Sequence, residues 1–299
     1  MASPILESAA PDDVTGAALV VLRRPRGIRI PGAIWIGGSL LGAMILICFV
    51  GPLFDHANET NAQQALLSSF PNAAPSSAHL FGTDGTGFDV FGRIMVGGRT
   101  SLIVGFAAAA LGSLIGGIWG ITAGLVRPSV DNAMMRVVDI ILSVPILYLL
   151  IVLAVVFRPS LILLILIIGG TSWVAMARFV RAETLSVRER DYVEAARSIG
   201  AGNLHIAIHH IVPNTIGTIT VNAVFQVADA ILVLAALGFV GLGVQPPATD
   251  WGSMLTSGVT YAVDGYWWEV YPVGVAIIVV VVSLNLIGEG IADRLGARR

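Results

Sequence analysis

Long apolar runs alternate along the chain with shorter polar segments. Several of the runs exceed the roughly 18 residues that mark a helix able to cross a membrane. They are continuously apolar, whereas the strands of a membrane barrel alternate between apolar and polar positions, so the pattern favours helices. It predicts an all-α bundle of about six membrane spans, at 30–51, 101–126, 135–157, 160–180, 214–240 and 270–291.

Composition excludes a soluble protein. Only 12% of the residues are charged, about half the share typical of soluble domains, while 56% are apolar and the mean hydropathy is +0.84. A soluble chain of 299 residues would need more polar surface than this to cover its core. The chain is therefore expected to be a polytopic membrane protein in contact with lipid.

Charge sets the expected orientation. The chain has 17 basic residues, and all of them are arginine. If the N-terminus is cytoplasmic, only Arg93, Arg99 and Arg158 lie at or near the outer face, and the other 14 lie at the cytoplasmic side. Cytoplasmic loops are enriched in basic residues, so both termini are predicted to be cytoplasmic. No basic stripe with interleaved aromatic residues is present, which argues against nucleic-acid binding.

This topology divides the chain into segments. The N-terminal tail has few large apolar residues and is predicted to be disordered. The segments are the cytoplasmic tail 1–29, the first span 30–51, an extracytoplasmic loop 52–100, a core of spans 101–292 that contains the cytoplasmic segment 181–213 and the outer loop 244–269, and the cytoplasmic tail 293–299.

The sequence offers no motif for catalysis or for a cofactor. Without lysine it can form neither a Walker A loop nor a Schiff base. His205, His209 and His210 lie close together, but a metal site needs an enclosed position and a further ligand, so we interpret them as residues of a helix surface. We expect no catalytic residue, bound cofactor or metal in this chain.

The polar segment 181–213 predicts two short helices joined by an elbow. Glu183 to Arg197 is rich in helix-forming residues, and Gly200 interrupts it. A second short helix is expected to begin at Asn203, which would be its N-cap. Pro213 can begin the next span, because proline is tolerated in the first turn of a helix.

One face of the second short helix is apolar. Leu204, Ile208 and Ile211 follow each other at i, i+4 and i+7. The helix pair is therefore either a rigid knob that transmits motion from a soluble partner, or an amphipathic hairpin that lies on the membrane surface.

Three polar residues share one side of the predicted fifth span. Asn222, Gln226 and Asp229 are spaced at i, i+4 and i+7. In hydrocarbon such a stripe must face protein or water. Two interpretations remain: these side chains hydrogen-bond to neighbouring helices, or they line a translocation path.

Aromatic residues gather near the predicted outer face. Tryptophan and tyrosine collect where a membrane meets water. We expect an aromatic belt there, with stacking on a substrate as the alternative; the residues are Trp251, Tyr261, Tyr266, Trp267 and Trp268.

The polar segment resembles the cytoplasmic coupling loop of the membrane subunits of ABC importers. Glu194-Ala195-Ala196 stands before Gly200, and Pro213 follows, at the spacing of that loop. Four more regions resemble, in order, the C-type subunits of dipeptide, oligopeptide and nickel permeases: His79–Val90 with Gly98–Leu102, Asp131–Pro145, Gly238–Gly252 and Asn285–Gly290. The resemblance covers 79–299. The chain departs from it at Phe88, where a basic residue is usual, and at Val212, where leucine is usual.

The resemblance implies a type I ABC importer permease in a bacterial inner membrane. It implies a homologous second permease subunit, two cytoplasmic ATPases that bind ATP and Mg²⁺, and an extracytoplasmic binding protein that delivers di- or oligopeptides to loops 52–99 and 244–269. An importer of nickel or another small solute remains an alternative, as does an ion-coupled secondary transporter, although we find no clear internal repeat. The implied ATPase-coupling residues are Glu194, Ala195, Ala196, Gly200, Ala201, Leu204, Ile208 and Pro213.

Overall fold

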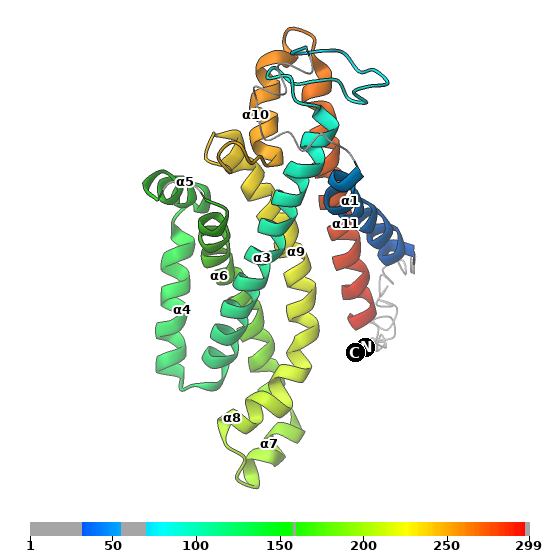
Figure 1. Cartoon of the computed structure of the whole chain (residues 1–299). Helices are drawn as coiled ribbons and strands as arrows, with labels where there is room; N and C mark the ends of the chain where they lie inside the picture. Colours follow the sequence, from blue (N-terminus) through cyan, green and yellow to red (C-terminus); the bar gives the residue numbers. More distant parts are fainter. Residues whose placement is uncertain (1–31, 55–69, 158–159, 297–299) are drawn as a thin grey trace, which may run out of the picture. The chain divides into compact units, whose positions relative to one another are not determined.

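The computed structural model describes residues 32–54, 70–157 and 160–296. The predicted tail 1–29 and part of the loop 52–100 lie outside these ranges. Within them the regular secondary structure is helical apart from one β-bridge, between Thr83 and Asp89. The elements (Figure 1) are α1 (Gly32–Phe54), α3 (Val90–Leu125), α4 (Pro128–Ser143), α5 (Ile146–Val156), α6 (Leu161–Arg188), α7 (Asp191–Ser198), α8 (Asn203–Ile206), a π-helix (Ala207–Ile211), α9 (Val212–Phe239), α10 (Trp251–Ala262), a 3₁₀ turn (Trp267–Glu269) and α11 (Tyr271–Gly296).

The helices confirm the predicted class. Five elements of the described chain are long and apolar enough to cross a membrane, and the bent pair α4 and α5 makes a sixth if it is counted as one span. One start differs from the prediction: α3 begins at Val90, inside the segment assigned to the loop 52–100. The reason is the cap at Asp89, whose carboxylate accepts a hydrogen bond of 2.7 Å from the Gly92 N–H and so satisfies one free donor of the first turn.

The third predicted span, 135–157, is broken into two helices. The chain bends by 79° between α4 and α5. Pro145 lies at the bend, and a proline both lacks an N–H and disfavours a helical conformation of the residue before it. Val144 is accordingly extended. Two ion pairs hold α4 to α6, one from Arg181 to both oxygens of Asp131 and one from Arg178 to Asp139.

α3 and α6 pack closely against each other (Figure 1), and a row of glycines on α3 lies at their contact. The row is Gly112, Gly116, Gly120 and Gly124 on α3. A Cβ on Gly116 would lie 2.5 Å from the Trp173 carbonyl oxygen, and one on Gly120 would lie 2.6 Å from the Ala177 carbonyl oxygen. Close packing of small residues is a main source of attraction between helices in a membrane, where lipid removes the hydrophobic drive.

Gly120→Leu is therefore expected to push α3 away from α6. Overpacking of a close interface costs about 1–3 kcal/mol or more, so we expect a lower melting temperature in detergent and less monodisperse protein. Gly38→Leu is the matched control, because a Cβ on Gly38 of α1 meets nothing within 4 Å. The measurement is thermal unfolding followed by size-exclusion chromatography. Equal melting temperatures for both variants would contradict the packing described here.

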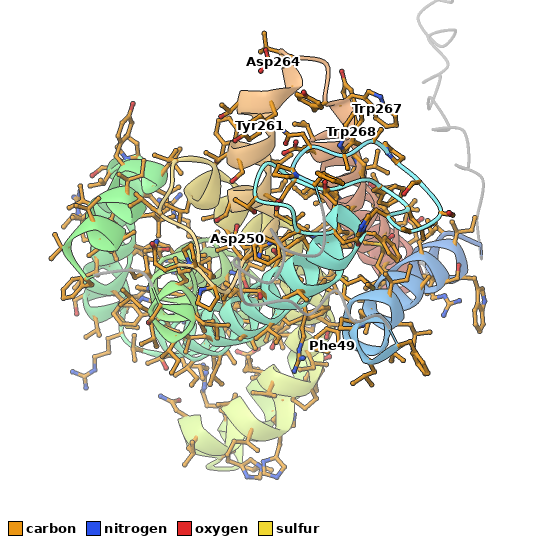
Figure 2. The ribbon with its side chains drawn as sticks, turned by 45° about the horizontal axis from the view of Figure 1, so that its top comes forward. Phe49, Asp250, Tyr261, Asp264, Trp267 and Trp268 are labelled. Atoms are coloured by element: carbon orange, nitrogen blue, oxygen red, sulfur yellow. The ribbon has the colours of Figure 1, made fainter. Side chains whose placement is uncertain are left out.

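One end of the bundle carries α10 and the aromatic cluster. Tyr261, Tyr266, Trp267 and Trp268 are joined through contacting ring pairs, and Tyr261, Trp267 and Trp268 are labelled near the exposed Asp264 in Figure 2. The belt prediction is wrong for Trp251, which is fully buried. Its ring N–H donates to the Ile94 carbonyl oxygen at 3.1 Å, because the start of α10 packs against α3.

Candidate coupling segment and membrane cavity

Within the segment 181–213, α7, α8 and the π-helix form a helical knob at the end of the bundle away from α10 (Figure 1). The predicted helix over Glu183–Arg197 is wrong as a single element. α6 continues to Arg188, the chain is extended at Arg190, and α7 then begins at Asp191. Asp191 and Glu194 both lie in the first turn of α7, where the helix dipole favours negative charge. The two acidic residues therefore favour a new helix start at Asp191, which explains why α6 and α7 are separate helices.

The predicted elbow at Gly200 is present, and its hydrogen bonds explain why it needs glycine. α7 ends at Ser198, and Gly200 has a φ of +92°, in the left-handed region. The Gly200 N–H donates to the Arg197 carbonyl oxygen and the Ala201 N–H to that of Ala196, both at 3.0 Å. This is a Schellman C-cap, in which glycine avoids the steric penalty that other residues meet.

The second short helix differs from the prediction in its cap and its end. Gly202, not Asn203, is the N-cap of α8, and it offers no side-chain hydrogen bond. α8 ends at Ile206, and a π-helical turn connects it to α9, where Pro213 lies in the first turn. The π-helical turn places one extra residue per turn at the junction between the knob and the span.

The inner side of the knob is a small apolar core. Val187 of α6, Val193 of α7, Ile206 of α8 and Ile211 of the π-helix are all fully buried together. Ile121 and Leu125 of α3 and Ala201 pack against them. The Arg188 guanidinium also donates to the Gly124 carbonyl oxygen at 2.7 Å. The knob is therefore packed onto the ends of α3 and α6 and continues into α9.

The outer side of the knob carries exposed apolar residues. Leu204 is 74% exposed and Ile208 is 54% exposed. The predicted ridge is wrong for Ile211, which faces the inner core. Sequence reasoning missed Ile199, which is 88% exposed. It is the C-cap of α7 and therefore has no place in the i, i+4, i+7 spacing of the second short helix. Three large apolar side chains exposed on one short segment indicate a contact surface for a partner.

The remaining candidate residues of this segment also lie on the knob. Glu194 and Ala195 are exposed on α7, and Ala196 is partly buried there. His205 and His209 stack with their ring centroids 4.1 Å apart, and both are exposed. Among the described residues no three His, Cys, Asp or Glu side chains are placed to hold a metal ion.

A second feature is a cavity of about 520 Å³ beside the bend of the third span, named here the membrane cavity. It lies between the bend at Pro145, the middle of α6 and one face of α9. Its lining is mostly apolar; the polar members are Thr171, Ser172, Gln226 and Asp229.

The predicted stripe on α9 separates into three different environments. Gln226 lines the membrane cavity but is bound on both sides: it accepts from the Ser113 hydroxyl at 2.8 Å and donates to the Ser172 carbonyl oxygen at 2.7 Å. Asn222 donates to the Thr218 carbonyl oxygen of its own helix and does not line the cavity. Asp229 lines the cavity and forms no hydrogen bond or ion pair with any described residue.

Comparison with known proteins places the chain among permeases. Residues 112–299 match the family described as binding-protein-dependent transport system inner membrane component. The probable D,D-dipeptide transport system permease protein DdpC of Escherichia coli is 39% identical over 221 residues, 74% of each chain. A putative peptide permease protein of Brucella suis biovar 1 is 40% identical over 228 residues, 76% of each chain.

A third relative covers more of the sequence. A putative peptide transport system permease protein of Brucella suis biovar 1 is 37% identical over 263 residues, which are 88% of this chain and 87% of the relative. The family match and these relatives agree with the helical bundle and its spans. This chain therefore belongs to the family of inner membrane components of binding-protein-dependent transport systems.

Proposed function

We propose that this chain is one of two homologous permease subunits of an ATP-driven importer of di- or oligopeptides. A membrane component of a binding-protein-dependent system works with a binding protein and further subunits, and is not itself the catalytic subunit. The names of the relatives, which are dipeptide or peptide permeases, support peptides over nickel as the cargo. ATP and Mg²⁺ would be bound by two cytoplasmic ATPases.

The observation that carries this proposal is the knob formed by α7, α8 and the π-helix. Its outer side offers Ile199, Leu204 and Ile208 to a soluble partner, and its inner side is packed against α3 and α6. A force applied to the exposed side is passed to the spans, because a packed core transmits displacement rather than absorbing it. This is the arrangement that an ATPase-coupling segment requires, with Glu194, Ala195, Ala196, Gly200, Ala201 and Pro213 supplying its helices, elbow and exit.

The membrane cavity is proposed to be part of the translocation path. Asp229 is the residue that supports this role, since an unpaired carboxylate among apolar side chains is costly in a membrane unless it meets water, a cation or a partner subunit. Gln226 holds α3, α6 and α9 together at the edge of the cavity. Asn222 has no part in the path on this account.

Asp229→Ala is expected to lower peptide uptake at least about tenfold, which corresponds to about 1.4 kcal/mol in the limiting step, while the complex still assembles. Asn222→Ala, about two turns away on the same helix and outside the cavity, should stay near wild type. Uptake of radiolabelled peptide into proteoliposomes measures both. Full uptake by Asp229→Ala in a normally assembled complex would remove the cavity from the path.

The complex itself tests the assignment as a whole. The tagged chain would be purified in mild detergent from its native membrane, and the proteins that remain bound would be identified by mass spectrometry. A second permease subunit with two ATP-binding subunits is the expected result.

Competition for uptake between Ala-Ala and Ni²⁺ then separates a peptide importer from a nickel importer. A stable, monodisperse chain that transports without partners would contradict the proposal.

A further inference from the structure

A second cavity, named here the outer cavity, lies at the α10 end of the bundle. Its volume is about 240 Å³. Three of its lining residues are ionisable: Asp84 before α3, Arg93 in the first turn of α3 and Glu269 in the 3₁₀ turn before α11. A wider cavity of about 650 Å³ adjoins it and shares Asp84, Arg93, Pro246 and Ser257 with it. These two cavities are separate from the membrane cavity, with which they share no lining residue.

Glu269 is a buried carboxylate without a full partner. The residue is only 3% exposed, and neither of its carboxylate oxygens accepts a hydrogen bond of normal geometry from a described residue, although the Gly85 N–H interacts with the group. Asp250, a buried carboxylate of the same region labelled in Figure 2, accepts bonds from the Val244 and Ser253 N–H groups and from the Ser253 hydroxyl. Buried carboxylates are normally satisfied in this way, so Glu269 is the exception.

Arg93 carries a positive charge in the same cavity, and the hydrogen-bonding groups of its guanidinium are also incompletely paired. Its guanidinium lies over the Phe88 ring at 4.7 Å, and one Nη donates a long bond of 3.4 Å to the Pro247 carbonyl oxygen. Its Nε is buried and has no acceptor among the described residues. No ion pair in the described chain joins Arg93 to Asp84 or Glu269, although Asp84 interacts electrostatically with both.

The cavity holds an acidic group, on Glu269, and a basic group, on Arg93, that form no ion pair, and this restricts the chemistry of a ligand. A metal cation would meet Arg93, and no set of three ligating side chains is present among the described residues. A simple anion would meet two carboxylates. A zwitterion satisfies both signs, because a buried charge is stabilised by an opposite charge that hydrogen-bonds to it. A short peptide is such a ligand near neutral pH, with one ammonium and one carboxylate.

We infer that the outer cavity is a binding site for the zwitterionic termini of a short peptide, with Glu269 and Asp84 facing the ammonium and Arg93 facing the carboxylate. The inference rests on the proposed peptide import and on the orientation predicted from the distribution of arginine, which puts α10 on the outer side. In that orientation the wider cavity is the entrance, and the peptide reaches this site before the membrane cavity. The permease would then check that both ends of its cargo are free.

The test is direct binding of L-Ala-L-Ala to the purified complex in lipid nanodiscs, without binding protein or nucleotide, by saturation-transfer NMR. Saturable binding is expected, and N-acetyl-Ala-Ala and Ala-Ala-amide should each bind at least about tenfold more weakly. Glu269→Gln should remove the preference for a free amino end and keep the preference for a free carboxylate. Arg93→Gln should do the reverse. Asp264→Asn, an exposed acid at the same end outside the cavity, should behave as wild type.

Several outcomes would overturn the site. They are no saturable binding of Ala-Ala to the wild-type complex, equal binding of the blocked peptides, or loss of binding in Asp229→Asn but not in Glu269→Gln. A fourth is that Glu269→Gln weakens docking of the binding protein while Ala-Ala binding is unchanged, which would make the cavity a protein contact. Comparison of blocked and free peptides on the wild-type complex keeps the test valid if a variant misfolds. Peptide uptake by the wild type is measured in parallel, and its absence would instead contradict the proposed function.

Discussion

Gly200→Pro is expected to abolish peptide uptake and the stimulation of ATP hydrolysis, while the chain still inserts in the membrane. Gly200 has a φ of +92°, whereas proline is fixed near −65°. Its N–H also donates to the Arg197 carbonyl oxygen, and proline has no N–H. The elbow between α7 and α8 therefore cannot keep its shape. Uptake and binding-protein-stimulated ATPase activity in proteoliposomes are the measurements.

Gly202→Pro is the matched control for this prediction. Gly202 has a φ of −72°, which suits proline, and a Cβ there meets nothing within 4 Å. This variant should keep most of its uptake. Gly200→Ala should be intermediate, because a left-handed conformation costs an L-residue about 1–2 kcal/mol. Normal coupling in Gly200→Pro would show that the elbow does not transmit force.

The double change Ile199→Glu with Leu204→Glu is expected to release the ATPases from the permease. Both side chains are largely exposed and lie on the outer side of the knob, so the charges should leave its inner core intact. Buried apolar contacts at the centre of an interface often contribute 2 kcal/mol or more, about thirtyfold in affinity. We expect at least that loss in the affinity of the ATPases, measured by titration of the purified subunits onto nanodiscs.

Asn203→Glu provides the comparison on the same surface. Asn203 is exposed and directly precedes Leu204, so its replacement adds one negative charge to this surface without removing an apolar contact. It should retain the ATPases. Wild-type affinity in the double variant, with a knob that is still folded by circular dichroism, would mean that the ATPases bind elsewhere.

The helical class could be predicted from the sequence because long apolar runs leave a chain few ways to satisfy its backbone in lipid. The bend at Pro145 could not, since the runs on both sides are equally apolar and the period of a helix does not show a break. The ion pairs of Asp131 and Asp139 with Arg181 and Arg178 fix α4 on α6. They join residues far apart in the sequence, and no local pattern indicates them.

The candidate site shows the same limit at the level of single residues. The glycine elbow was predictable because Gly200 has a local role. Which residues of the knob face inward was not, since Ile211 is buried in a core shared with α3, α6 and α7, and the sequence pattern of its own helix does not indicate these contacts. On α9 the spacing put Asn222, Gln226 and Asp229 on one side, but the bonds of Gln226 to Ser113 and Ser172 come from other helices. No sequence pattern indicated that Glu269 belongs to a site, because its burial depends on how the chain folds at the α10 end.

The most direct test of the central claim is site-specific photocrosslinking in native membranes. A benzophenone amino acid would be placed at Leu204 on the knob and, separately, at Asp264 at the α10 end. The account predicts that Leu204 crosslinks to an ATP-binding subunit and that Asp264 does not. A crosslink from Leu204 to lipid alone would contradict it, and would identify the segment 181–213 as a hairpin lying on the membrane surface.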